Sequence, residues 1–103
     1  MKELFSKLTP AEIERLALLG EEMGEAHQII GKILRHGYHS CHPNGGPTNR
    51  KLLEKELGDV RAAIALMLTA GDVGRIELWL HEQAKVVKVQ KYLHHQRKEK
   101  SNG

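Results

Sequence analysis

The stretch LALLGEEMGEAHQIIGKI, residues 16–33, decides the fold class of this 103-residue chain. Its apolar residues recur at alternating steps of three and four, which is the period of an α-helix. A half-buried β-strand would instead alternate apolar and polar residues with a period of two. We therefore predict a long helix whose apolar row packs against other helices; the row consists of Leu16, Leu19, Met23, Ala26, Ile30 and Ile33.

The ends of this first helix are marked by residue types that favour helix termini. Thr9 suits the N-cap, Pro10 the first helical position and Glu12 the third, where its side chain can complete a capping box. We expect the helix to end near Arg35, before a loop over residues 36–49 that is rich in Gly, Pro and Asn.

Two further helices are expected after the loop. The second should begin near Asn49 or Arg50 and stop at Ala70, and its apolar row consists of Leu53, Leu57, Val60, Ile64 and Met67. A third should follow with Asp72 as its cap, and its weak apolar period around residues 82–85 suggests a break there.

The composition agrees with an all-α protein. Only 4% of the residues are aromatic and 40% are hydrophobic, and aliphatic residues supply most of the candidate core. We predict one helical domain over residues 1–103, with three to four helices and a polar, disordered tail over about residues 96–103. So small a domain buries a modest part of its surface, so we expect oligomerisation to complete the core.

Several protein classes are disfavoured by the sequence. The single cysteine, Cys41, cannot form an internal disulfide, and the N-terminus has no long apolar segment of the secretory type. No apolar run approaches the length of a membrane span, about 18 residues. We therefore expect a cytoplasmic protein that does not enter a membrane.

The positive charge is concentrated in the last part of the chain. Residues 1–84 hold 10 Lys or Arg against 12 Asp or Glu, whereas residues 85–103 hold 6 against 1. This pattern favours a solvated helix end, and nucleic acid is not the expected partner. The alternative is a non-catalytic helical module that binds nucleic acid through residues 85–100, but that hypothesis leaves the carboxylates of the two longer helices unexplained.

Two pairs of carboxylates lie within apolar rows of the first two helices. Glu22 and Glu25 are three residues apart, as are Glu56 and Asp59, and this spacing lets both members of a pair reach one ion. Their rows contain leucine, isoleucine and alanine but no Lys or Arg. Because burying unpaired carboxylates is costly, a divalent metal is the expected partner, and oxygen ligands favour Mg²⁺, with Mn²⁺ as the alternative.

Three glycines are expected to serve the same site. Gly20, Gly24 and Gly58 lie inside the predicted helices, where each glycine costs about 1 kcal/mol relative to alanine. We expect them to let the two helix backbones approach closely, so that the carboxylates converge.

Glu21-Glu22-Met23-Gly24-Glu25 followed by Glu56-Leu57-Gly58-Asp59 resembles the EExxE…ExxD signature of the MazG-like nucleoside-triphosphate pyrophosphohydrolases. This family also includes dimeric dUTPases and dCTPases. The resemblance covers about residues 10–95 and is strongest with the small phage and bacterial members. The chain departs from the commonest pattern in its long spacer of 30 residues between Glu25 and Glu56.

The resemblance implies a MazG-like or dimeric-dUTPase-type helical bundle that forms a homodimer or homotetramer. It implies that Glu22, Glu25, Glu56 and Asp59 ligate Mg²⁺, and that the enzyme hydrolyses a (d)NTP to a (d)NMP and pyrophosphate. A narrower alternative is a hydrolase specific for purine deoxynucleotides, such as dGTP or dATP, in a phage that remodels its host's nucleotide pool.

Two glutamates are the expected catalytic residues. Glu22 would orient the attacking water or accept its proton. Glu21 points about 100° away from Glu22 on a helix, so we expect it to have a supporting role.

The substrate contacts are expected outside the carboxylate pairs. Tyr38 in the loop could stack on the base, and Lys88, Lys91 and Tyr92 could contact the phosphates from the third helix. The loop also contains His36, His39, Cys41 and His42, but their spacing matches no closed four-ligand zinc pattern.

Overall fold

A computed structural model describes residues 6–96, and it confirms an all-α chain over that range. The helices are α1 (Pro10–His36), α2 (Asn49–Ala70) and α3 (Arg75–Val89). The only extended pairing between described residues is an isolated antiparallel bridge between Cys41 and Thr48. The chain forms two compact units, residues 1–72 and residues 73–103, which are described separately below.

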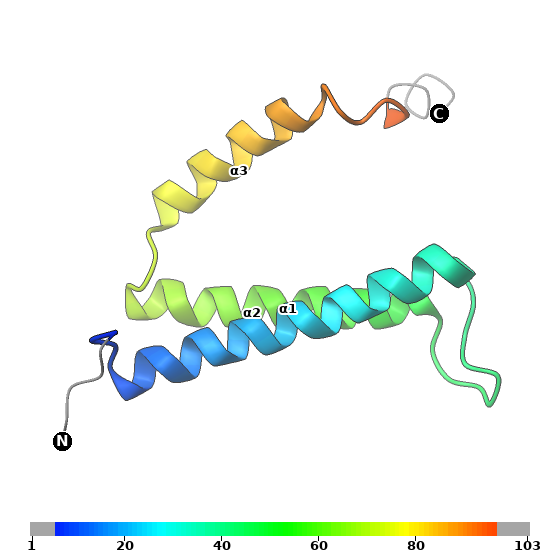
Figure 1. Ribbon diagram of the computed structural model, residues 1–103, viewed down its shortest axis with the longest axis horizontal. Coiled ribbons are helices and arrows are strands. Elements are labelled where there is room, and N and C mark those ends of the chain that lie inside the picture. The colour runs from blue at the N-terminus through cyan, green and yellow to red at the C-terminus, as the bar shows by residue number, and fades with distance from the viewer. Residues whose placement is uncertain (1–5, 97–103) are drawn as a thin grey trace. The chain divides into compact units, whose positions relative to one another are not determined.

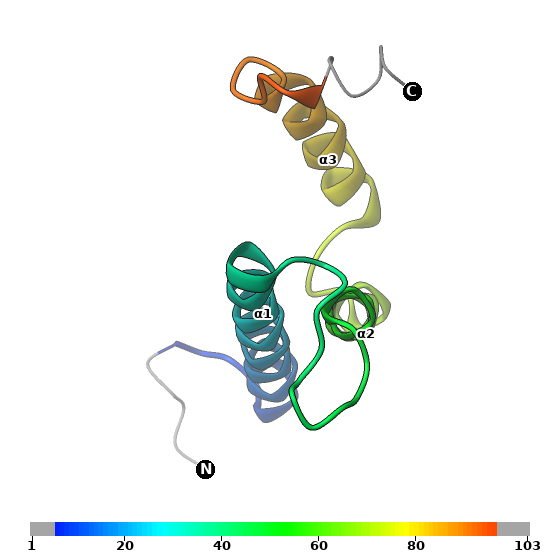
Figure 2. The ribbon, with the colours of Figure 1, turned by 90° about the vertical axis from the view of Figure 1, so that its right-hand side faces the viewer.

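The first unit is an antiparallel helical hairpin of α1 and α2 (Figures 1 and 2). The predicted start of α1 is confirmed: the Thr9 hydroxyl accepts a hydrogen bond from the Glu12 backbone N–H at 3.1 Å, and the Glu12 side chain accepts one from Thr9 at 2.8 Å. The helix ends at His36, and its C-cap is Gly37, whose φ of 89° favours glycine. The bounds predicted for both helices are therefore correct to within one residue.

The connection between α1 and α2 is pinned where it leaves and rejoins the helices. The Asn49 backbone N–H donates to Ser40 O at 2.8 Å, and the Arg50 N–H donates to Tyr38 O at 2.9 Å. The buried Asn49 side chain donates to Gly37 O at 3.1 Å. These bonds close the base of the loop, while Gly45 and Gly46 turn its tip with positive φ.

The face of α1 that packs on α2 differs from the predicted apolar row. Leu19, Ala26 and Ile33 are half-buried or buried as expected, but Leu16, Met23 and Ile30 are exposed. The neighbouring row is turned inward instead, and it consists of Leu18, Glu22, Glu25 and Ile29. The predicted row was therefore right for three of its six residues, and the packed face also includes the apolar row in which the sequence places Glu22 and Glu25.

The packed face of α2 agrees with the predicted apolar row at four of its five residues. Leu53, Val60, Ile64 and Met67 are at least half-buried, while Leu57 is 46% exposed. Among the described residues, the buried apolar side chains are Ala26, Ala63 and Met67. Such a small core leaves much of the hairpin's apolar surface uncovered.

The open end of the hairpin is held by an ion pair. Arg15 donates to both carboxylate oxygens of Asp72, through Nε at 2.6 Å and Nη2 at 3.0 Å. This bidentate geometry gives the stronger kind of Arg–carboxylate pair. The prediction that Asp72 caps the third helix was wrong, because its side chain is engaged by Arg15 and the N-cap of α3 is Gly74.

The second unit contains α3, and most of its side chains are exposed. The predicted break near residues 82–85 is absent, since α3 is continuous from Arg75 to Val89. Turns follow up to residue 96. The predicted disordered tail falls almost entirely on residues 97–103, outside the described range.

Within residues 6–96, no helix has both the length and the apolar character that a membrane crossing requires.

Candidate metal centre

Four carboxylates converge between α1 and α2. One oxygen from each of Glu22, Glu25, Glu56 and Asp59 can be chosen so that all four lie within 4.8 Å of one another. The three-residue spacing places two of these side chains on one face of each helix, and antiparallel packing brings the two pairs together. The convergence predicted from the sequence is thus present in the structure.

These carboxylates are withdrawn from water to different degrees. Glu56 is buried, with 9% of its surface exposed, and the other three residues are half-buried. Glu22 Oε2 and Glu56 Oε2 are both inaccessible and have no hydrogen-bond partner. Burying a carboxylate oxygen without a donor is costly, and neither of these atoms has a positive partner that would offset the cost.

The pKa values of two of these carboxyls reflect the absence of a positive partner. Burial, together with the charges of Asp59 and Glu56, raises the pKa of the Glu22 carboxyl above its ordinary value. A side-chain hydrogen bond with Glu56, together with the charges of Glu22 and Glu56, raises the pKa of Glu25. The folded chain therefore holds protons on Glu22 and Glu25 more tightly than free carboxyls would.

Lys55 supplies a cation that the sequence reasoning missed. Its Nζ lies 2.8 Å from Asp59 Oδ2 and 3.4 Å from Glu56 Oε1, and these hydrogen bonds raise the pKa of the lysine. The available signal was the four-residue spacing between Lys55 and Asp59, a common helical ion pair. The argument that no Lys or Arg neutralises the carboxylates was therefore wrong for one edge of the cluster.

The compensation by Lys55 is incomplete. The lysine side chain is 64% exposed and reaches Asp59, the most exposed of the two carboxylates it contacts, rather than the inaccessible Oε2 of Glu56. One cation also cannot balance four carboxylates when they are all ionised. The inner oxygens of Glu22 and Glu56 still lack a partner.

The glycines do not have the role predicted for them. A Cβ atom added at Gly20, Gly24 or Gly58 would meet nothing within 4 Å, and all three residues are exposed. Each lies one or two residues from a packed glutamate, which turns it roughly 100–200° away on the helix. Close approach of α1 and α2 therefore does not explain these glycines.

Glu21 is exposed on α1 and does not belong to the group of four. Its position follows from the rotation of about 100° per residue that separates it from Glu22. Its charge nevertheless contributes to the raised pKa values of Glu22 and Glu25.

The residues predicted to bind substrate are all exposed. Tyr38 packs its ring beneath the Arg50 guanidinium, which lies 5.0 Å from the ring centroid. Lys88, Lys91 and Tyr92 belong to the second unit. Within residues 6–96, the loop histidines and Cys41 are not gathered into a group that could share a metal ion.

Comparison of the chain with protein-family models, with curated proteins and with solved structures gave no match.

Proposed function

We propose that the protein is a Mg²⁺-dependent nucleoside-triphosphate pyrophosphohydrolase, with Mn²⁺ as an alternative ion. The observation that carries this proposal is the convergence of four carboxylates from two helices within 4.8 Å. A structural ion pair would need one carboxylate, and a solvated acidic patch would not leave two carboxylate oxygens inaccessible and unpartnered.

The residues present fit a hard divalent cation. All four candidate ligands are carboxylates, and oxygen-only donor sets favour Mg²⁺ over Zn²⁺. The buried oxygens of Glu22 and Glu56 are acceptors without donors, which is the state that a cation would relieve. Glu22, Glu25, Glu56 and Asp59 would hold the ion.

The chemistry is the attack of water on the α-phosphate of a (d)NTP. A new bond forms between the water oxygen and the α-phosphorus, the bond from that phosphorus to the α–β bridging oxygen breaks, and pyrophosphate leaves. When bound, Mg²⁺ supplies charge neutralisation at the phosphoryl oxygens.

The chain's own residues would handle the proton. Glu22 is half-buried and lies among the other three carboxylates, which places it beside a water held at a bound ion. It therefore takes the proton of the attacking water, or orients that water. Glu21, exposed beside it, acts through its charge on Glu22 and Glu25.

The nucleoside and the rest of the substrate are assigned to residues outside the cluster. The candidate substrate contacts are Tyr38 on the loop and, in the second unit, Lys88 in α3 with Lys91 and Tyr92 after it, and all four are exposed. The preference for a purine deoxynucleotide, the narrower version of this function, depends on those contacts.

We further propose that the active form is a homodimer or homotetramer of MazG-like architecture. The support is the uncovered apolar surface of the hairpin, where Leu16, Met23 and Ile30 recur along one strip of α1. A strip of this length on a helix favours packing against another helix.

The test is a panel of NTPs and dNTPs assayed for pyrophosphate release with Mg²⁺. Wild type should hydrolyse at least one of them, and Glu25→Gln and Asp59→Asn should lose most turnover because each removes a ligand with little change in volume. Glu54→Gln is the matched control, since Glu54 is exposed on α2 and outside the group of four. If Glu25→Gln keeps more than half of the wild-type rate at saturating Mg²⁺, the assignment is wrong.

A further inference from the structure

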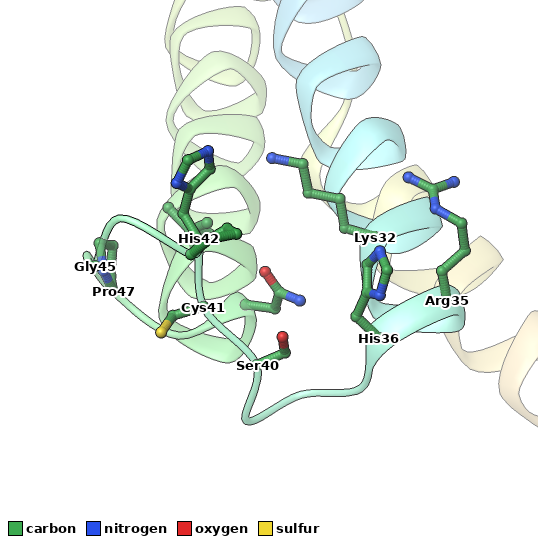
Figure 3. A pocket seen from close by; sticks show the side chains of 11 residues that line it. Lys32, Arg35, His36, Ser40, Cys41, His42, Gly45 and Pro47 are labelled. Carbon is green, nitrogen blue, oxygen red and sulfur yellow. The ribbon is translucent and has the colours of Figure 1, made fainter.

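A second candidate site lies at the loop end of the hairpin, inside the first unit (Figure 3). It is a cavity of about 340 Å³, near the lower limit of about 300 Å³ for small-molecule sites. The last turns of α1, the loop and the start of α2 form its walls. The lining residues are Lys32, Arg35, His36, Ser40, Cys41, His42, Pro43, Gly45, Pro47, Asn49 and Leu52.

The lining is basic. It includes Lys32, Arg35, His36 and His42, and it contains no Asp or Glu. Figure 3 shows Lys32 on α1 extending toward His42 on the loop, with His36 further along α1. Arg35 stands at the far edge of the last turn of α1, and its guanidinium lies beside Gly31. The His42 Nδ1 accepts a hydrogen bond from the Asn44 backbone at 3.1 Å, so its other nitrogen can donate.

The charges of this cavity are not neutralised by neighbours. Among residues 6–96, Lys32 and Arg35 form no salt bridge, whereas Arg15 is paired with Asp72 and Lys55 with Asp59. Unpaired cations that share one cavity favour an anionic ligand with several acceptor oxygens.

The backbone around the cavity is held by hydrogen bonds that a bound ligand would leave intact. The first backbone N–H groups of α2 are already used, since Asn49 donates to Ser40 O and Arg50 donates to Tyr38 O. The direct donors would therefore be the basic side chains. The positive end of the α2 dipole adds to their attraction for an anion.

The cavity and the carboxylate cluster are neighbours on the same two helices. Lys32 follows Glu25 by seven residues, about two turns or roughly 10 Å along α1. Leu52 precedes Glu56 by four residues, about one turn or 6 Å along α2.

We propose that this cavity binds the terminal phosphates of the nucleotide and retains pyrophosphate after cleavage. The inference rests on the proposed function for the identity of the ligand, but the phosphate-binding site itself does not require catalysis. It assigns opposite charges to two parts of one hairpin: carboxylates that hold the cation, and a basic cavity that holds the leaving group.

The direct test is the binding of pyrophosphate in EDTA, measured by isothermal titration calorimetry and by backbone amide NMR shifts. Without a divalent ion the carboxylate cluster repels pyrophosphate, so binding under these conditions reports a basic site. Wild type should bind, with the largest shifts at residues 32–36 and 40–49. Lys32→Ala/Arg35→Ala should weaken binding at least about tenfold, because charge-assisted hydrogen bonds are lost.

The matched control is Lys51→Ala/Arg61→Ala, which removes the same charge from exposed residues of α2 that do not line the cavity. It should bind pyrophosphate within about twofold of wild type, a difference small beside a tenfold loss. A second comparison is Lys88→Ala/Lys91→Ala in the second unit, where Lys88 lies in α3 and Lys91 follows it. Circular dichroism establishes that each variant keeps its helicity. If Lys32→Ala/Arg35→Ala fails this check, Lys32→Gln alone takes its place.

Three results would overturn the proposal: no pyrophosphate binding by wild type in EDTA, equal weakening in the Lys51/Arg61 control, or loss confined to the Lys88/Lys91 variant. Failure of the proposed function looks different. In that case no nucleotide would be hydrolysed with Mg²⁺, while pyrophosphate would still bind and still depend on Lys32 and Arg35.

Discussion

At the scale of single residues, the carboxylate cluster makes stability depend on pH in the direction opposite to an ordinary salt bridge. The pKa values of Glu22 and Glu25 are raised above the ordinary 4.5 in the folded chain. The folded state therefore binds more protons than the unfolded state above about pH 4.5, so the free energy of unfolding falls as the pH rises through this range. Asp72 acts in the other sense, because Arg15 lowers its pKa and its contribution is lost as the pH falls.

Urea unfolding in EDTA between pH 5 and 8 measures this effect. Wild type should lose stability as the pH rises, and Glu22→Gln/Glu25→Gln should show a flatter profile. With saturating Mg²⁺ the trend should reverse, because the ion binds the deprotonated carboxylates. Equal profiles for wild type and variant in EDTA would mean that these two groups do not control the titration.

Lys55 is expected to compete with a metal ion for the cluster. Its Nζ occupies the edge of the site, at 2.8 Å from Asp59 Oδ2. Lys55→Met should therefore bind Mg²⁺ more tightly than wild type in the absence of nucleotide, while being less stable in EDTA. Calorimetric titration with Mg²⁺ gives the affinity, and Lys51→Met is the control because Lys51 is exposed on the same helix. Weaker Mg²⁺ binding by Lys55→Met would show that the lysine supports the site.

At the scale of elements, the outer faces of α1 and α2 carry glycines that serve neither helix packing nor a turn. Gly24→Ala should raise the free energy of unfolding by about 1 kcal/mol, since alanine is the better helix former and its methyl group meets nothing. Gly37→Ala is the contrasting change. Because Gly37 has a φ of 89°, any side chain at this position should lower the free energy of unfolding. A loss of stability in Gly24→Ala would place another copy of the chain against this face.

The helices themselves were predictable because their signals are local. Thr9, Pro10 and Glu12 define the start of α1 within four residues, and the apolar period does the rest. The packed face of α1 was predicted only in part, because two neighbouring rows fit the helical period and the structure buries residues from both. Asp72 was misassigned because its partner, Arg15, is brought to it by the packing of α1 on α2. Lys55 was overlooked although Asp59 lies four residues away on the same helix.

At the scale of the whole molecule, a bound ion should stabilise the fold. A ligand at about 100 times its Kd adds roughly 2.7 kcal/mol when it binds the folded state alone. Thermal unfolding at fixed protein concentration should give a higher midpoint in Mg²⁺ than in EDTA. Glu25→Gln/Glu56→Gln should respond much less, and equal responses would remove the physical basis of the metal site.

The association state should depend on the exposed strip of α1. Met23, with 55% of its surface exposed, lies in the middle of that strip. Met23→Lys should shift the protein toward monomer in sedimentation velocity, whereas Ala17→Lys, an exposed position on a different face of the helix, should not. A monomeric wild type would show that the strip has another role.

The division of the four carboxylates between two helices has a consequence for assembly from fragments. A cut between Gly45 and Gly46, at the tip of the pinned loop, would leave one piece with Glu22 and Glu25 and another with Glu56 and Asp59. Neither piece alone could offer more than two of the four ligands, so the ion would gain full coordination only when the pieces rejoin. A divalent cation would then promote the association of the two fragments, and the yield of reassembled hairpin would rise with the concentration of free ion.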